Sequence, residues 1–180
     1  EGEWTILAFS DVEVEYYWLF PSYTDLLNPE AVDYFITTTY EEYFKRYGDK
    51  FGSLIPGIFA DEPKAIGPLP WTGEFPAFFE RRRGYPIDEA LPALVIDIEG
   101  AFKYRTDYWR TVTELFKECY ADKLYEWCDQ HNLKFTGHIS PEEGPIYQVS
   151  LIGDLMSILK SMHIPGTDII TYRVGDKDNP

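Results

Sequence analysis

The sequence predicts an α/β protein in which parallel strands carry flanking helices. Short apolar runs of strand length alternate with longer segments whose apolar residues recur at every third and fourth position. Three of the short runs have side chains that can carry chemistry at or near one end, and parallel strands gather active-site groups at their carboxyl ends. No internal repeat or low-complexity tract interrupts the alternation.

The first part of the chain predicts two extended segments and one long helix. Trp4–Phe9 is apolar enough for a strand, and residues 12–18 alternate between apolar and polar side chains. Asn28–Glu30 supplies an N-cap, a proline at the first helical position and an acid in the first turn. Helical spacing of apolar residues then continues to about Tyr47, and Gly48 is suited to end the helix.

The rest of the chain continues the alternation of strands and helices. Strands are expected at Leu54–Ala60, at Leu133–Gly137 and, after a turn, within residues 164–170. Helices are expected at residues 73–83, 86–99, 101–131 and 151–162. The helix at 101–131 has the most regular apolar periodicity. Residues 64–72 carry two prolines and one glycine and predict a long loop.

The charge of the chain excludes some classes of partner. The 180 residues carry a net charge of −15, with a pI near 4.5. Such a surface repels nucleic acid and anionic membranes, so we expect neither as a partner. No apolar run reaches the ~18 residues that a membrane span needs, and the N-terminus has no signal-peptide core.

Cysteines and aromatic residues are interpreted mainly as core. Cys119 and Cys128 fall in one predicted helix, roughly 13 Å apart along its axis, too far for a disulfide between them. They are expected to be buried thiols. Aromatic residues make up 17% of the chain, and some of them could serve as flat faces for sugar rings.

Acidic side chains and one histidine lie at or near the ends of the predicted strands. Asp61 and Glu62 follow the first, and Asp168 lies near the start of the last. His138 follows the strand at 133–137, with Glu142 and Glu143 in the next loop. We expect these groups to converge at one edge of the sheet. Paired carboxylates suit glycoside hydrolysis, in which one acid protonates the leaving oxygen and the other acts as nucleophile or base.

Each of these residues also has a purely structural interpretation. Asp61 could bond local backbone amides at a loop start, and His138 could be a core histidine satisfied by a carbonyl. Glu142 and Glu143 could be surface acids, and Asp168 a turn acid.

The ordered set of segments resembles part of a bacterial glycoside hydrolase barrel. The segments are FGSLIPGIFADEP, FFERRRGYPIDEALPAL, YRTDYW, WCDQHNLKFTGH and MHIPGTDII, between about Tyr23 and Ile170. They are similar to polysaccharide-degrading hydrolases related to families 2 and 106, the latter being α-L-rhamnosidase-like. The resemblance implies a TIM-barrel-like arrangement of (β/α) units, here an incomplete barrel of about four parallel strands in a single domain over residues 1–180.

The resemblance also implies roles for residues. In retaining barrel hydrolases the acid/base glutamate ends strand four, and the FADEP segment places Glu62 there. The usual preceding residue is asparagine, whereas this chain has Asp61. The second carboxylate of that clan comes from strand seven, which 180 residues do not obviously reach, since a barrel takes roughly 250. We therefore expect a fragment, and a periplasmic or extracellular location.

The main hypothesis is a glycosidase catalytic region acting on oligo- or polysaccharides. Glu62 would be the general acid/base, tuned by Asp61, and Glu143, Glu142 or Asp168 could supply a base in an inverting mechanism. His138, Glu142 and Asp168 would contact the sugar, and Trp71 would supply a stacking face. No cofactor is required, although the rhamnosidase-like group implies that Ca²⁺ could bind. Exposed barrel edges would favour self-association.

Two alternatives remain open from the sequence. One is a non-catalytic carbohydrate-binding domain that uses the aromatic residues and the acids. The other is a metal-dependent barrel hydrolase with oxygen and nitrogen ligands from Asp61, His138, Glu142 and Asp168.

Overall fold

A three-stranded parallel sheet organises the protein. The computed structural model describes residues 2, 4–13, 23–139, 142 and 144–168. The sheet contains β1 (Gly57–Asp61), β2 (Lys134–His138) and β3 (Ile164–Pro165) in that order. The α/β class is confirmed, with three parallel strands in the described residues against the about four expected. These strands form an open sheet, so the barrel and the single-domain organisation stay predictions.

Alternate side chains of β1 face different surroundings. Ile58 and Ala60 pack into the hydrophobic core, and Ala60 is buried. Phe59, between them, is 63% exposed. Because successive side chains of a strand point to opposite faces, Asp61 shares the side of Phe59, away from the core. The strand thus places its last acid on the open side of the sheet.

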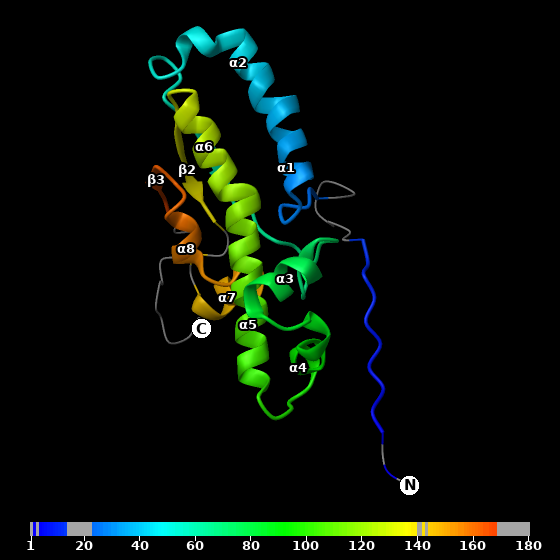
Figure 1. Cartoon of the computed structure of the whole chain (residues 1–180). Coiled ribbons are helices and arrows are strands. Elements are labelled where there is room, and N and C mark those ends of the chain that lie inside the picture. Colours follow the sequence, from blue (N-terminus) through cyan, green and yellow to red (C-terminus); the bar gives the residue numbers. More distant parts are fainter. Residues whose placement is uncertain (1, 3, 14–22, 140–141, 143, 169–180) are drawn as a thin grey trace.

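The predicted helix at residues 29–47 is confirmed, with a wider turn in its middle. α1 (Pro29–Phe35) continues through a π-helical turn at η1 (Ile36–Tyr40) into α2 (Glu41–Tyr47), and a 3₁₀ turn follows at η2 (Gly48–Lys50). Gly48 is the C-cap as expected. Figure 1 shows α1 and α2 as one arm along the side of the molecule.

The N-cap of this arm gives a testable stability effect. The Asn28 side-chain oxygen accepts a hydrogen bond from the Glu30 amide at 2.9 Å, so it satisfies one of the amides that a helix start leaves free. We expect Asn28→Ala to lower the free energy of unfolding by about 1 kcal/mol. Urea unfolding followed by circular dichroism measures this. Asn28→Asp should retain most of the stability, and an unchanged midpoint for Asn28→Ala would contradict the capping role.

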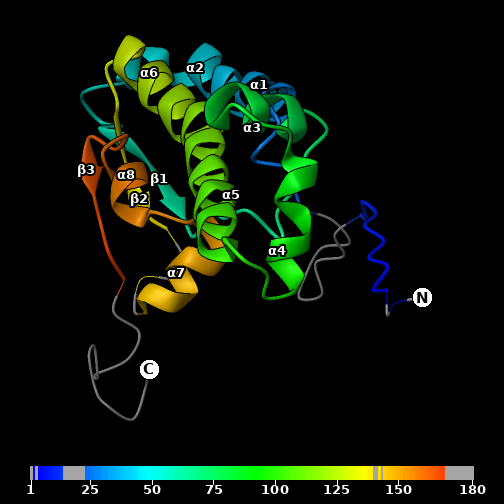
Figure 2. The same ribbon diagram turned by 60° about the horizontal axis from the view of Figure 1, so that its bottom comes forward.

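One long helix runs through the centre of the protein. It comprises α5 (Ala101–Phe116), a second π-helical turn at η4 (Lys117–Ala121) and α6 (Asp122–Gln130), which confirms the prediction for residues 101–131. Both views show it as a continuous rod with other helices around it (Figures 1 and 2). α5 contacts the helices before and after it, and α6 contacts β2.

Shorter helices surround this rod. They are α3 (Phe75–Arg83), η3 (Ile87–Glu89), α4 (Leu91–Val95), α7 (Pro145–Ile152) and α8 (Leu155–Leu159). The prediction of a single helix over residues 151–162 is wrong, because the chain turns between α7 and α8 at Gly153. Gly153 has φ +75°, and a β-carbon there would lie 2.1 Å from the Thr113 hydroxyl oxygen.

The prediction of a strand at Trp4–Phe9 is also wrong. Residues 4–12 have no regular secondary structure, and Trp4 and Ile6 are 87% and 91% exposed. Figure 1 shows this segment extending away from the rest of the described chain, where no strand lies beside it to pair with. Residues 14–18 of the second expected extended segment lie outside the described residues.

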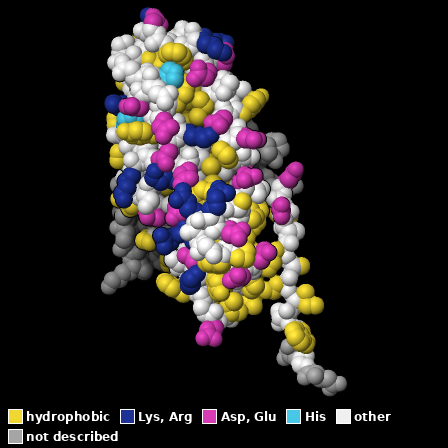
Figure 3. Space-filling model, viewed as in Figure 1, with side chains coloured by type: hydrophobic (Ala, Val, Ile, Leu, Met, Phe, Trp, Pro, Cys, Tyr) yellow, Lys and Arg dark blue, Asp and Glu magenta, His cyan; other side chains and the backbone are white. Residues whose placement is uncertain are grey.

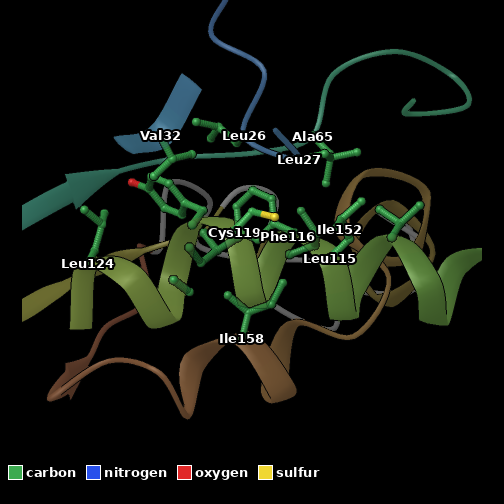
Figure 4. Close-up of a cluster of buried hydrophobic side chains, with 14 of the residues drawn as sticks. Leu26, Leu27, Val32, Ala65, Leu115, Phe116, Cys119, Leu124, Ile152 and Ile158 are labelled. Carbon is green, nitrogen blue, oxygen red and sulfur yellow. The ribbon is translucent and has the colours of Figure 1, made fainter. Parts of the chain in front are cut away.

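The core lies on both sides of the central helix. Figure 4 shows Val32 of α1 on one side of it and Ile158 of α8 on the other, with Phe116 between them. All three side chains are fully buried. Burial of a large apolar side chain contributes about 1.5–3 kcal/mol to the stability of the fold. This cluster therefore holds α1 and α8 against the central helix.

Both cysteines are buried thiols, as predicted. Burial raises the pKa of Cys119 to about 11 and that of Cys128 to about 12. We therefore expect both to resist a thiol reagent at pH 8 in the folded protein and to react once guanidinium unfolds it, because the thiolate is the nucleophile. The stabilisation from the raised pKa values is complete below the unfolded thiol pKa near 9 and is lost as pH rises through 11 to 12. Rapid labelling of the native protein would contradict this assignment.

The described surface mixes both signs of charge. On the face seen in Figure 3, acidic and basic side chains are interspersed. Arg82 of α3, for example, pairs with Glu118 of η4. None of the described helices has the length and apolar character needed to cross a membrane.

Candidate functional site

The ends of β1 and β2 bring two of the predicted site residues together. The strands pair in parallel register, with Asp61 opposite His138. His138 Nε2 lies 3.1 Å from Asp61 Oδ1. The convergence expected for these two residues is therefore observed at the carboxyl edge of the sheet. Their roles toward a substrate stay predictions.

Glu142 reaches the same imidazole from the loop after β2. Its Oε1 atom lies 3.1 Å from His138 Nδ1. The Glu142 side chain is only 7% exposed, whereas that of Asp61 is 79% exposed. The backbone oxygen of Glu142 also accepts a hydrogen bond from the Gln148 side chain of α7, which ties this loop to the helix. Asp61, His138 and Glu142 are called the acid–histidine cluster below.

Phe59 borders the acid–histidine cluster and was not singled out from the sequence. Its ring meets the His138 ring edge-on, with centroids 5.7 Å apart. The signal was present in the period of the strand, because Phe59 is two residues before Asp61 and so lies on the same face. An exposed aromatic ring beside carboxylates is a suitable contact for the apolar face of a sugar.

Glu62 lies immediately after β1 in an uncommon backbone conformation. Its φ is +50°, a region that side chains other than glycine rarely adopt. The residue is partly exposed, and its carboxylate makes no hydrogen bond or ion pair within the described part of the chain. Backbone strain of this kind costs on the order of 1–3 kcal/mol and is concentrated at functional sites. The conformation turns the chain between Asp61 and the buried Pro63.

Trp71, which was expected to offer a face to a sugar ring, packs in part against the core. Its ring packs on Phe75 with centroids 5.2 Å apart and planes tilted by 35°. The preceding residue, Pro70, is fixed because its carbonyl accepts a hydrogen bond from the buried Tyr108 hydroxyl at 2.7 Å. Trp71 keeps partial exposure, so its sugar contact stays a prediction.

The other two predicted site residues are not placed in the cluster. Asp168 is exposed in the segment after β3 and makes no ion pair among the described residues. Glu143, the expected second carboxylate, lies outside the described residues. The structure therefore tests neither of them as a partner of Glu62.

A metal site is not evident in the described residues. Nowhere in this part of the chain do three histidine, cysteine or acidic side chains converge as they would to hold an ion. Each ring nitrogen of His138 already faces a carboxylate, so neither points at open space. The described residues thus offer no ligand set that fits the calcium implied by the sequence resemblance.

A cavity of about 500 Å³ lies away from this cluster. Its wall is formed by α5 and the α7–α8 region, including Phe102, Trp109 and Val149, and it is mostly apolar. None of Asp61, Glu62 and His138 lines it. The candidate site is therefore the open carboxyl edge of the sheet and not this cavity.

Comparison with known proteins shows which class of protein this chain resembles in fold and in sequence. Over 79% of its length the chain matches 14% of the structure of a rhamnosidase from Novosphingobium sp. PP1Y, with a TM-score of 0.63 and 22% identity. It is also 28% identical over 138 residues to a curated Formosa agariphila protein that is named, provisionally, as a β-glucuronidase. That match covers 73% of this chain and 12% of the relative.

The family follows from the match of a family model over most of the chain. The model of glycoside hydrolase family 106, described as α-L-rhamnosidase, matches residues 23–178. The chain belongs to this family, as the sequence resemblance indicated. It spans less than a sixth of the length of each relative compared here.

Proposed function

We propose that this chain forms part of the catalytic region of a glycosidase that cleaves glycosidic bonds in oligo- or polysaccharides. The observation that carries the proposal is the Asp61–Glu62 pair at the tip of β1, beside His138 of β2, in a chain of glycoside hydrolase family 106. Carboxylates at the carboxyl edge of parallel strands are the groups that glycoside hydrolysis uses.

Glu62 is the proposed general acid/base. Its carboxylate has no partner among the described residues, so it is free to meet a leaving-group oxygen. Asp61 is exposed and holds a sugar hydroxyl, since a carboxylate accepts hydrogen bonds from hydroxyl groups. Glu143 is proposed as the second carboxylate, and Trp71 and Asp168 as further sugar contacts. Substrates outside the cell would suit a periplasmic or extracellular protein.

An assay with defined sugars tests this function. The names of the family and the relatives suggest two substrate classes, α-L-rhamnosides and β-glucuronides. The assay uses aryl glycosides of both classes. We expect the native protein that contains this chain to hydrolyse those of one class and release the free phenol. Binding of a sugar without hydrolysis of any of these aryl glycosides would instead support a carbohydrate-binding domain. Activity that chelation abolishes and calcium restores would place a metal in the site.

A further inference from the structure

Phe59 is an exposed aromatic residue on the open side of β1. Its neighbours Ile58 and Ala60 pack into the core, whereas Phe59 is 63% exposed. A single exposed apolar side chain is common on a protein surface, so exposure alone assigns it no role. What distinguishes Phe59 is its position beside the acids of the candidate site.

The spacing along β1 sets Phe59 next to Asp61 on one face of the strand. Successive side chains of a strand alternate between faces, so residues 59 and 61 share a side, with Cα atoms about 6–7 Å apart. The Asp61 side chain is 79% exposed. An open aromatic ring and an open carboxylate therefore lie side by side at the carboxyl edge of the sheet, and Glu62 follows them directly.

This pair matches the two kinds of surface on a sugar ring. A pyranose presents C–H groups on its faces and hydroxyl groups around its rim. The C–H groups leave water when a face stacks on an aromatic ring, and the rim hydroxyls can donate hydrogen bonds to a carboxylate. The spacing of residues 59 and 61 is comparable to the width of one sugar ring, so a single unit can contact both side chains.

The ring of Phe59 is held in place without being covered. Its edge-on contact with His138, with planes at 61°, restricts its rotation, and His138 itself lies opposite Asp61 in the sheet. Trp71 packs on Phe75 and is less exposed than Phe59. Phe59 is thus the more open of the two rings. Because its ring is already ordered, it loses little conformational freedom when a sugar binds.

We propose that Phe59 is the stacking platform of the site, and that its ring binds the apolar face of the sugar unit whose hydroxyl group Asp61 holds. The stacked unit then presents its glycosidic oxygen to Glu62. This proposal rests on the proposed function and adds to it a substrate-binding residue. Because the stacking contact is the same in the bound substrate and in the transition state, it contributes to affinity and not to the chemical step.

Sugar binding by the native protein that contains this chain tests the platform. Calorimetric titration uses L-rhamnose and D-glucuronic acid, neither of which carries an aryl group that could itself stack. For the sugar that binds, we expect Phe59→Ala to raise Kd about tenfold or more. Phe59→Tyr keeps the flat ring and should stay within about threefold. Phe102→Ala is the matched control, because Phe102 is an exposed phenylalanine of α5, and it should change nothing.

Kinetics separates this role from a structural one. With aryl glycosides of the class that is cleaved, Phe59→Ala should raise KM about tenfold or more and leave kcat within about threefold. A ring that acted only by holding His138 in place would lower kcat instead. A ring that another part of the native protein covers would lower the urea midpoint of unfolding when removed, with sugar affinity unchanged. Either of these results would contradict the platform.

The outcomes also separate this proposal from the proposed function. Hydrolysis that does not depend on Phe59 would refute the platform alone, as would a loss of affinity in Phe59→Tyr as large as that in Phe59→Ala. Sugar binding that depends on Phe59, in a protein that hydrolyses no glycoside, would support the platform and refute the catalytic role. Absence of both binding and hydrolysis would overturn both.

Discussion

Replacement of Glu62 by glutamine should lower turnover about 10²- to 10⁴-fold in the native protein, because loss of a general acid/base removes this much rate. Glutamine preserves the size of the side chain and removes the ionisable proton. Glu62 makes no hydrogen bond or ion pair within the described residues, so the folded structure should be unaffected. Steady-state kinetics on a glycoside with a sugar-like leaving group measures the effect.

The matched control is Glu89→Gln. Glu89 is exposed in η3 and remote in sequence from the strand ends, so its replacement should leave turnover unchanged. Circular dichroism and thermal unfolding confirm that both variants fold. A Glu62→Gln protein that retains full turnover would remove Glu62 from the mechanism.

Gly137→Ala should prevent β1 and β2 from pairing in their present register. Gly137 lies opposite Ala60, and an added β-carbon would lie 2.1 Å from the Ala60 carbonyl oxygen and 2.7 Å from its nitrogen. Both atoms belong to the backbone and cannot move aside cheaply. The φ of Gly137 is +140°, which also disfavours a side chain. We expect a loss of about 3 kcal/mol or more in the free energy of unfolding, or failure to fold.

Gly73→Ala is the comparison for this effect. A β-carbon at Gly73 meets no atom within 4 Å, so the change should alter stability by less than about 1 kcal/mol. Denaturant unfolding of the two variants side by side separates the close approach from a general effect of replacing glycine. Equal midpoints for both would contradict the close strand approach.

The sequence predicted those elements whose stability comes from local pattern. The arm at residues 29–47 has an N-cap, a first-turn proline and apolar residues at helical spacing, and the central helix repeats such spacing for thirty residues. The meeting of Asp61 and His138 also followed from a general rule, since parallel strands share their carboxyl edge.

Features that depend on distant contacts could not be predicted in this way. The break between α7 and α8 depends on Thr113, whose hydroxyl occupies the space beside Gly153. Arg83 lies in a run of three arginines that indicates a solvated helix face, yet its side chain is 7% exposed and pairs with Glu114 of α5. The strand expected at Trp4–Phe9 had suitable composition, but no strand of the described chain lies beside it to pair with.

The candidate site shows the same division. The strand-end positions of Asp61 and Glu62 were readable from an apolar run followed by two acids. The contact of Glu142 with His138 was not, because it depends on how the loop after β2 folds back on the strand. The orientation of Trp71 toward Phe75 likewise depends on the loop that Tyr108 anchors.

The most direct test of the central claim, that Glu62 protonates the leaving group, is to measure how the loss of turnover in Glu62→Gln depends on the leaving group. Aryl glycosides with more acidic phenols need less proton donation at the transition state. We expect Glu62→Gln to be severely impaired with poor leaving groups and to approach the unsubstituted protein as the phenol becomes more acidic. An equal loss across the whole series would contradict a general-acid role for Glu62.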